Sequence, residues 1–161
     1  MATMPKGQIQ DVAGCLACDL ARGRRPLPGG MIHATGHWAV EHCVGPLGVG
    51  TLIVKPLRHV RHLWELREDE TAELGPLLGS TSAAIAALLS PDQVYVCLWS
   101  HSGWEPVHIH FVLQPLWGRQ REQYPRQGPF LQAEMFANGE TPAQKEVEAL
   151  AQAARQWMSA R

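Results

Sequence analysis

The sequence has no long hydrophobic run, no signal-like N-terminus and no excess of charge of one sign. Its apolar runs are all much shorter than the roughly 18 to 20 residues needed to span a bilayer. The N-terminal stretch MATMPKGQIQ lacks the apolar core of a secretory signal, so we expect a cytoplasmic protein without a membrane partner. With 14 basic and 15 acidic residues the formal charge is -1, so we expect no nucleic-acid partner either.

The chain is also short and poor in cysteine. Its 161 residues, 45% hydrophobic and 18% charged, predict one soluble domain with a single core. Only four cysteines occur, and in a reducing cytosol we expect them to be thiols or metal ligands instead of a disulfide framework. Cys43 and Cys97 lie in strand-like contexts and are predicted to be core residues. Cys15 and Cys18 form a Cys-x-x-Cys knuckle in an N-terminal arm, residues 1–30.

Several short β-prone runs follow the arm. Residues 31–35 and 37–43 are separated by Gly36 and predict a hairpin, and residues 51–55 predict a third strand. Residues 93–100, QVYVCLWS, have the composition of a further strand.

Two helices are predicted as well. Residues 69–90 carry a helical apolar stripe that begins at an acidic cluster and ends at Ser90-Pro91, although Pro76 inside the pattern could kink the helix. Near the C-terminus, Thr141 is the predicted N-cap, Pro142 the first helical residue and Gln144 the partner in a capping box.

The segment PVHIHFVLQP, residues 106–115, alternates with a period of two and predicts a strand between two prolines. One face is apolar and belongs in the core: Val107, Ile109, Phe111 and Leu113. The other face carries His108, His110, Val112 and Gln114. The two histidines are about 6.5 to 7 Å apart along the strand, so this face is either a working site or the solvated side of an ordinary strand.

Four motifs occur in a fixed order along the chain: the Cys-x-x-Cys knuckle, the GTLIVKPLRHV segment, the acidic helix start and the His-x-His strand. In this order they resemble the histidine-triad (HIT) superfamily of nucleotide hydrolases and transferases. The resemblance runs from Cys15 to about Trp117. It implies an α+β fold in which the helix 69–90 packs across an antiparallel sheet of about five strands and a C-terminal helix is added. Residues 31–117 would be the HIT-like core and residues 118–161 an extension. The resemblance also implies a homodimer formed through the long helix and one strand.

The histidine motif is incomplete, because only two of the three triad histidines are present, and it can be aligned in two registers. In one, His108 and His110 are the first and second members and Val112 replaces the third. In the other, Pro106 replaces the first member. We prefer the first register because it aligns Gly103 with the loop glycine of the family without a gap.

The resemblance implies a structural Zn²⁺ site. In zinc-containing members, the knuckle cysteines, the histidine after the Pro-x-Arg turn and the first triad histidine bind the metal. These roles carry over to Cys15, Cys18, His59 and His108, although His62 could replace His59. Two thiolates and two imidazoles suit a closed, four-coordinate Zn²⁺ shell.

The resemblance also implies a catalytic site, in which the middle triad histidine attacks the α-phosphorus of a nucleotide and forms a covalent nucleotidyl-histidine. This role carries over to His110, with His108 beside it. The attacking imidazole needs a hydrogen bond from its other nitrogen to a backbone carbonyl or a carboxylate, and the sequence does not identify that partner.

Donors to the phosphate are expected in the loop before the strand, where Ser100, Ser102 and Gly103 are the candidates. Val112 cannot act as the third triad histidine. Gln114 lies two positions later on the same face, and its amide either reaches the phosphate or simply faces solvent near the strand end.

The leading hypothesis is therefore a HIT-like nucleotide phosphohydrolase or nucleotidyl transferase that acts at the α-phosphate of a nucleoside phosphate derivative, such as a diadenosine polyphosphate. The alternative is a catalytically weak, zinc-stabilised nucleotide-binding or interaction module. A third possibility is a metal-sensing or storage site. Residues 118–140 have no counterpart in the resemblance and are predicted to form a lid or substrate-selecting loop with a short helix near residues 130–137.

Overall fold

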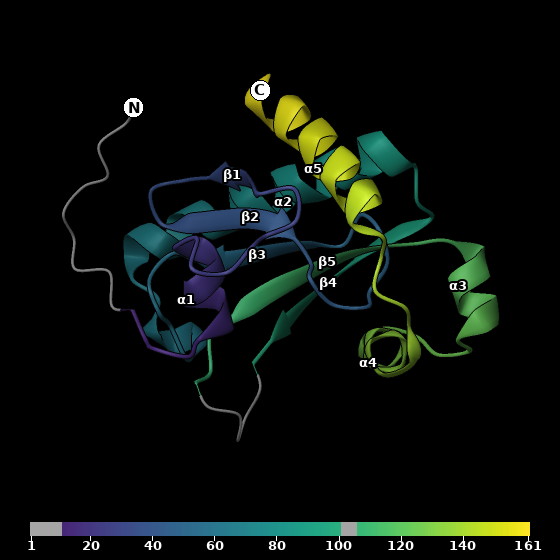
Figure 1. Ribbon diagram of the computed structural model, residues 1–161, viewed down its shortest axis with the longest axis horizontal. Helices are drawn as coiled ribbons and strands as arrows, with labels where there is room; N and C mark the ends of the chain where they lie inside the picture. The colour runs from purple at the N-terminus through teal and green to yellow at the C-terminus, as the bar shows by residue number, and fades with distance from the viewer. Residues whose placement is uncertain (1–10, 101–105) are drawn as a thin grey trace.

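The computed structural model describes residues 11–100 and 106–161. In this part of the chain, five strands form one antiparallel sheet in the order β1-β2-β3-β5-β4. Their bounds are β1 Met31–Ala34, β2 Trp38–His42, β3 Leu52–Pro56, β4 Gln93–Trp99 and β5 His110–Leu116. The predicted α+β fold with a five-stranded antiparallel sheet is confirmed (Figure 1).

Helices lie on both faces of this sheet. Helices α2 (Glu68–Leu89) and α5 (Gln144–Ser159) pack on one face, over the larger core cluster. Helix α4 (Pro129–Asn138) contributes Leu131 and Met135 to a second cluster on the opposite face. The remaining short elements are α1 (Leu16–Ala21), the 3₁₀ helix η1 (Leu63–Glu65) and α3 (Gly118–Gln123). Because both faces are covered, every residue of β2 and β3 is buried.

The helix predicted over residues 69–90 is α2, which contains Pro76. In the described part of the chain α2 alone is long and apolar enough to cross a membrane, judged by length and composition. Its Leu77 and Ile85 nevertheless pack into the core beside the sheet. Most of its outer surface is made of small residues and is exposed.

Two predicted boundaries were wrong. Strand β5 begins at His110, three residues later than predicted, and it includes Pro115, which pairs with Val94. Helix α5 begins at Gln144 with Ala143 as its N-cap, because the backbone N–H groups of Glu146 and Val147 bond to the Ala143 carbonyl. Thr141 therefore lies before the helix.

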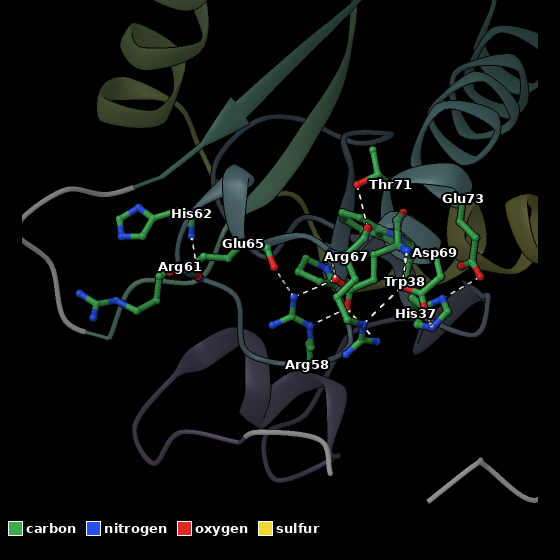
Figure 2. A network of polar contacts seen from close by, with 12 residues as sticks. His37, Trp38, Arg58, Arg61, His62, Glu65, Arg67, Asp69, Thr71 and Glu73 are labelled. Carbon is green, nitrogen blue, oxygen red and sulfur yellow. Dashed lines mark hydrogen bonds and ion pairs between the residues drawn. The ribbon is translucent and has the colours of Figure 1, made fainter. Parts of the chain in front are cut away.

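The start of α2 is held by Glu70, a buried carboxylate. Its Oε2 accepts the backbone N–H of Arg67 at 2.8 Å, as in a capping box. The guanidinium of Arg58 donates to both oxygens, at 2.5 and 2.8 Å. The indole of Trp38 donates to the Glu70 backbone carbonyl at 2.8 Å. Figure 2 shows Trp38, Arg58 and Arg67 meeting at this junction, which joins β2 and the loop after β3 to α2.

We expect Glu70→Gln to destabilise the protein by about 2 to 4 kcal/mol at pH 7, because it leaves the Arg58 guanidinium without its charged partner. Burial raises the pKa of Glu70, but the hydrogen bonds and charge of Arg58 outweigh burial and hold it below its ordinary value of 4.5. A lowered carboxyl pKa adds stability above pH 4.5 that is lost as the pH falls through the folded value.

The difference in free energy of unfolding between wild type and Glu70→Gln should therefore be large at pH 7 and shrink below about pH 4.5. Urea unfolding at several pH values measures it. Glu134→Gln is the matched control, because the ion pair between Glu134 and Arg126 is exposed and worth about 0 to 1 kcal/mol. Equal effects of the two substitutions at pH 7 would contradict the role of Glu70.

Candidate functional site

Four side chains from three separate segments gather at one end of the sheet. One ligand atom each from Cys15, Cys18, His59 and His108 lies within 4.8 Å of the other three. The Nδ1 of His108 lies 3.4 Å from the Sγ of Cys15 and 3.6 Å from that of Cys18. The Nδ1 of His59 lies 3.4 Å from the Cys18 sulfur. The structure thus brings together all four residues expected to bind zinc.

These distances fit a tetrahedral metal shell. With Zn–S near 2.3 Å and Zn–N near 2.0 to 2.1 Å, neighbouring ligand atoms of a tetrahedral site lie about 3.3 to 3.8 Å apart. The three S···N distances, 3.4, 3.4 and 3.6 Å, fall in this range. Both cysteines and His108 are buried and His59 is half-buried, so the cluster is largely shielded from solvent, as structural zinc sites are.

The protonation of His108 suits a ligand. Its Nε2 lies 3.1 Å from the carbonyl oxygen of Pro56, so the proton belongs on Nε2 and the Nδ1 lone pair faces the cysteines. Burial, helped by the neighbouring His59, lowers the pKa of His108 to about 3 and keeps it neutral. Burial also raises the pKa of the Cys18 thiol to about 12, so a thiolate here needs a cation beside it.

Local structure explains how the ligands meet. Cys15 is the N-cap of α1 and Cys18 lies in its first turn, and residues three apart share one side of a helix. His59 lies in the loop that leaves β3. His62, the alternative to His59 as a zinc ligand, lies elsewhere. Its ring stacks on Trp64 with 4.3 Å between the ring centroids. Figure 2 shows His62 beside Arg61 and η1, and it is not a member of the cluster.

A cavity of about 390 Å³ lies next to this cluster, on the face of the sheet away from α2. Its size is within the range of small-molecule sites. His108 and His110 both line it, so the His-x-His face is a cavity wall and not a solvated strand face. Among the other lining residues are Cys43, Ile53, Lys55, Trp99 and Val112.

The ring of His110 is oriented by the backbone. Its Nδ1 lies 3.1 Å from the carbonyl oxygen of His108, the partner that the sequence did not identify. A carbonyl can only accept, so Nδ1 carries the proton and the ring lone pair is on Nε2. His110 pairs with Trp99 across β4 and β5, and both side chains line the cavity.

Within the described part of the chain, the structure does not place the other residues predicted to contact the phosphate in the cavity wall as donors. Ser102 and Gly103 lie outside the described residues. Ser100 is exposed and is not among the residues that line the cavity. Val112 lines the cavity, but it is nearly fully buried and can donate no hydrogen bond.

The position of Gln114 does not support a phosphate contact or a solvent-facing side chain. It is fully buried and lies outside the cavity lining. Its amide nitrogen donates to the Leu47 carbonyl at 3.2 Å and lies 3.1 Å from the sulfur of Met135. The reason is that α4, which carries Met135, covers this end of β5.

Sequence reasoning missed two charged residues of the cavity. Glu41 and Lys55 line it, and the Lys55 ammonium lies 2.6 Å from Glu41 Oε1. The sequence did contain a signal: the apolar run WAVEHC carries one acidic residue, and the apolar run TLIVKP carries one basic residue. These two runs form neighbouring strands. Buried charges are almost always paired, so two such charges on adjacent strands predict a pair.

No family model and no curated protein sequence matches the chain, but solved structures do. A hypothetical histidine triad nucleotide-binding protein from Sulfolobus tokodaii is 18% identical with a TM-score of 0.69, over 91% of this chain and 93% of that one. A Zn-bound histidine triad family protein from Mycobacterium smegmatis is 17% identical with a TM-score of 0.64, over 91% and 94%. A Hit-like protein involved in cell-cycle regulation, from Bartonella henselae with an unknown ligand, is 14% identical with a TM-score of 0.66, over 91% and 98%.

These matches cover nearly the whole of each chain, so the likeness is one of complete topology and not of a shared motif. The chain has the histidine triad fold, as the sequence resemblance predicted.

Proposed function

We propose that this chain of histidine triad fold is a zinc-stabilised nucleotide phosphohydrolase or nucleotidyl transferase. Its substrate would be a nucleoside phosphate derivative, such as a diadenosine polyphosphate, and the reaction would occur at the α-phosphate. One observation carries the proposal: His110 lines a cavity of about 390 Å³ and its Nδ1 is held by the His108 carbonyl.

In the proposed reaction, the Nε2 lone pair of His110 attacks the α-phosphorus. The P–N bond forms as the P–O bond to the leaving group breaks, and the leaving group departs with the bonding electrons. Positive charge then develops on the imidazole. The His108 carbonyl stabilises this charge because it accepts a hydrogen bond from the Nδ1–H group. Water or another acceptor takes the nucleotidyl group in a second displacement, which regenerates the imidazole.

Zinc would be held by Cys15, Cys18, His59 and His108, whose donor set and distances fit it. When bound there, the metal would complete a closed structural shell. His108 then connects the two sites, because its ring would bind the metal while its backbone carbonyl orients His110. The metal would thereby help to hold the nucleophile in place.

Val112 favours a second candidate, a nucleotide-binding or interaction module without turnover. Valine at this wall supplies no donor to the phosphate or the leaving group. Loss of one such donor costs about 10²- to 10³-fold in rate, so the substitution alone slows an enzyme without changing its reaction class.

Trapping a labelled nucleotide on the protein tests the proposal and separates the two candidates. An adduct that survives denaturation in alkali and is released by acid supports the enzyme. Nucleotide binding without an adduct supports the module, and absence of both contradicts each of them.

We also propose a homodimer formed through β4 and α2. Strand β4 is an edge of the sheet, and edge strands offer unpaired backbone groups to a second chain. Val96 and Leu98 on this strand are 43% and 38% exposed and point to the side of the sheet that carries α2. The neighbouring outer surface of α2 includes the exposed Ala83 and Ala86. Exposed apolar side chains on neighbouring elements are typical of a protein interface.

The wild-type protein should therefore have twice the 17.8 kDa mass of one chain in sedimentation or light-scattering experiments. Val96→Lys combined with Leu98→Lys should shift it to the monomer, because two ammonium groups would be buried without partners. Phe130→Lys is the matched control: Phe130 is the more exposed side chain but lies on α4, and this variant should stay dimeric. A monomeric wild type would contradict the proposal.

A further inference from the structure

The ion pair between Glu41 and Lys55 is unusual because it is buried in a cavity wall. The two side chains are 3% and 1% exposed. Taking two opposite charges out of water costs several kcal/mol per ion. A buried ion pair therefore seldom stabilises a protein more than apolar side chains of similar volume would. The pair is therefore poorly explained by stability alone.

One oxygen of this pair has no partner in the described part of the chain. Glu41 Oε1 accepts from Lys55, whereas Oε2 is buried and makes no hydrogen bond with any described residue. An unsatisfied buried carboxylate oxygen is costly, and this cost is removed when a ligand donates to it. The ammonium has three N–H groups, and Glu41 uses one of them. The pair thus offers an acceptor and a donor side by side.

The sheet register places the pair near His110. Ile53 pairs with Val112 on β5, so the next inward-facing position on β3, Lys55, lies beside His110. Glu41 pairs with Ile53 from the other side, on β2. Neighbouring strands are about 4.8 Å apart, so Glu41 lies two strands, or about 10 Å, from the strand that carries the nucleophile. A nucleoside monophosphate with its phosphorus at His110 can reach this pair with its base.

We propose that Glu41 and Lys55 recognise the Watson–Crick edge of a guanine base, which makes a guanosine phosphate derivative the preferred substrate in place of a diadenosine polyphosphate. This inference rests on the proposed nucleotide function. Oε2 of Glu41 accepts from the N1–H and N2–H groups of the base, and the Lys55 ammonium donates to the O6 carbonyl. The surrounding wall residues Cys43, Leu47 and Ile53 are apolar, so these charge-assisted bonds form away from water, where they are strong.

Guanine fits this pair better than adenine does. Guanine places a carbonyl oxygen against the cation and two N–H groups against the anion. Adenine offers one exocyclic amine and a ring nitrogen, which leaves the carboxylate with fewer donors and the ammonium with a weaker acceptor. A site built to hydrogen-bond a substrate discriminates strongly against an analogue that leaves its buried groups unpaired.

Calorimetric titration of the zinc-loaded full chain with GMP, IMP and AMP tests the inference. We expect GMP to bind at least about tenfold more tightly than AMP, with IMP between them because it keeps N1–H and O6 but lacks the 2-amino group. In the double variant Glu41→Leu, Lys55→Met, the GMP preference should fall to within about twofold. This double variant removes both charges at once, and proteins usually tolerate the replacement of a whole buried ion pair by apolar side chains.

Two further variants keep the test decisive. Glu41→Gln keeps the shape of the side chain and removes only the anion, so it should weaken GMP binding by about tenfold while changing AMP binding little. The double variant Arg126→Gln, Glu134→Gln removes an exposed ion pair outside the cavity and should keep the GMP preference.

The possible failures are distinguishable. Equal affinities of wild type for GMP and AMP would overturn the guanine inference and leave the proposed function standing. Equal loss of affinity for all three nucleotides in the Glu41 and Lys55 variants would also overturn it, because the pair would then contact the phosphate or ribose. Failure of wild type to bind any of the three would overturn the proposed nucleotide function, and the inference with it.

Discussion

Substitution of His110 by alanine is expected to remove the covalent nucleotide adduct and to lower turnover by at least about 10³-fold. Alanine has no lone pair to attack phosphorus, so the reaction would lose its two-step route. Binding of the nucleotide should change much less, since His110 is one of many residues that line the cavity. The expected signature is therefore a fall in kcat with a nearly unchanged affinity.

His62→Ala is the matched control for this experiment. His62 is also a histidine near the loop after β3, but it stacks on Trp64 and does not line the cavity. Its removal should leave both the adduct and the rate unchanged. Full turnover in His110→Ala would contradict the assignment of the nucleophile. A wild-type protein that binds nucleotide without forming an adduct would instead favour the binding module.

The second large effect is expected from loss of the metal. Purified protein should contain one zinc ion per chain, and Cys18→Ser should remove it and lower the Tm by about 6 to 20 °C. A loss of about 3 to 5 kcal/mol shifts the Tm of a domain of this size by roughly 2 to 4 °C per kcal/mol. The physical reason is that Cys15, Cys18 and His108 are buried together, and the metal would join α1 to the loop after β3 and the segment just before β5.

Elemental analysis measures the metal and calorimetry the Tm, so neither readout depends on activity. Cys97→Ser is the matched control, because Cys97 lies on β4 and is not one of the four clustered residues. It should retain zinc and nearly the wild-type Tm. Protein that contains no zinc, or whose Tm a strong chelator leaves unchanged, would contradict the metal assignment.

Much of the fold could be predicted because its signals are local. The hairpin of β1 and β2 follows from two β-prone runs around Gly36, and α2 follows from an apolar stripe with an acidic start. Each depends on neighbours within a few residues, where propensity and periodicity act directly. The ligand positions Cys15, Cys18, His59 and His108 came from the family resemblance, since no local rule brings residues 93 positions apart together.

Other features depend on elements that are distant in sequence. Gln114 was predicted to face a phosphate or solvent, but α4 folds over the end of β5 and buries it against Leu47 and Met135. Alternation along a strand shows which residues share a face, but it cannot show what covers that face.

The amino-acid sequence by itself determined most of the strands and helices, the alternation that puts His108 and His110 on one side of the chain, and the residue types able to bind zinc. Only the tertiary structure decided that this side is the wall of a cavity, that the His108 carbonyl orients His110, and that Glu41 and Lys55 face the same space. The reason is that periodicity and propensity are properties of short segments, whereas burial and the pairing of charges depend on which segments the folded chain places side by side.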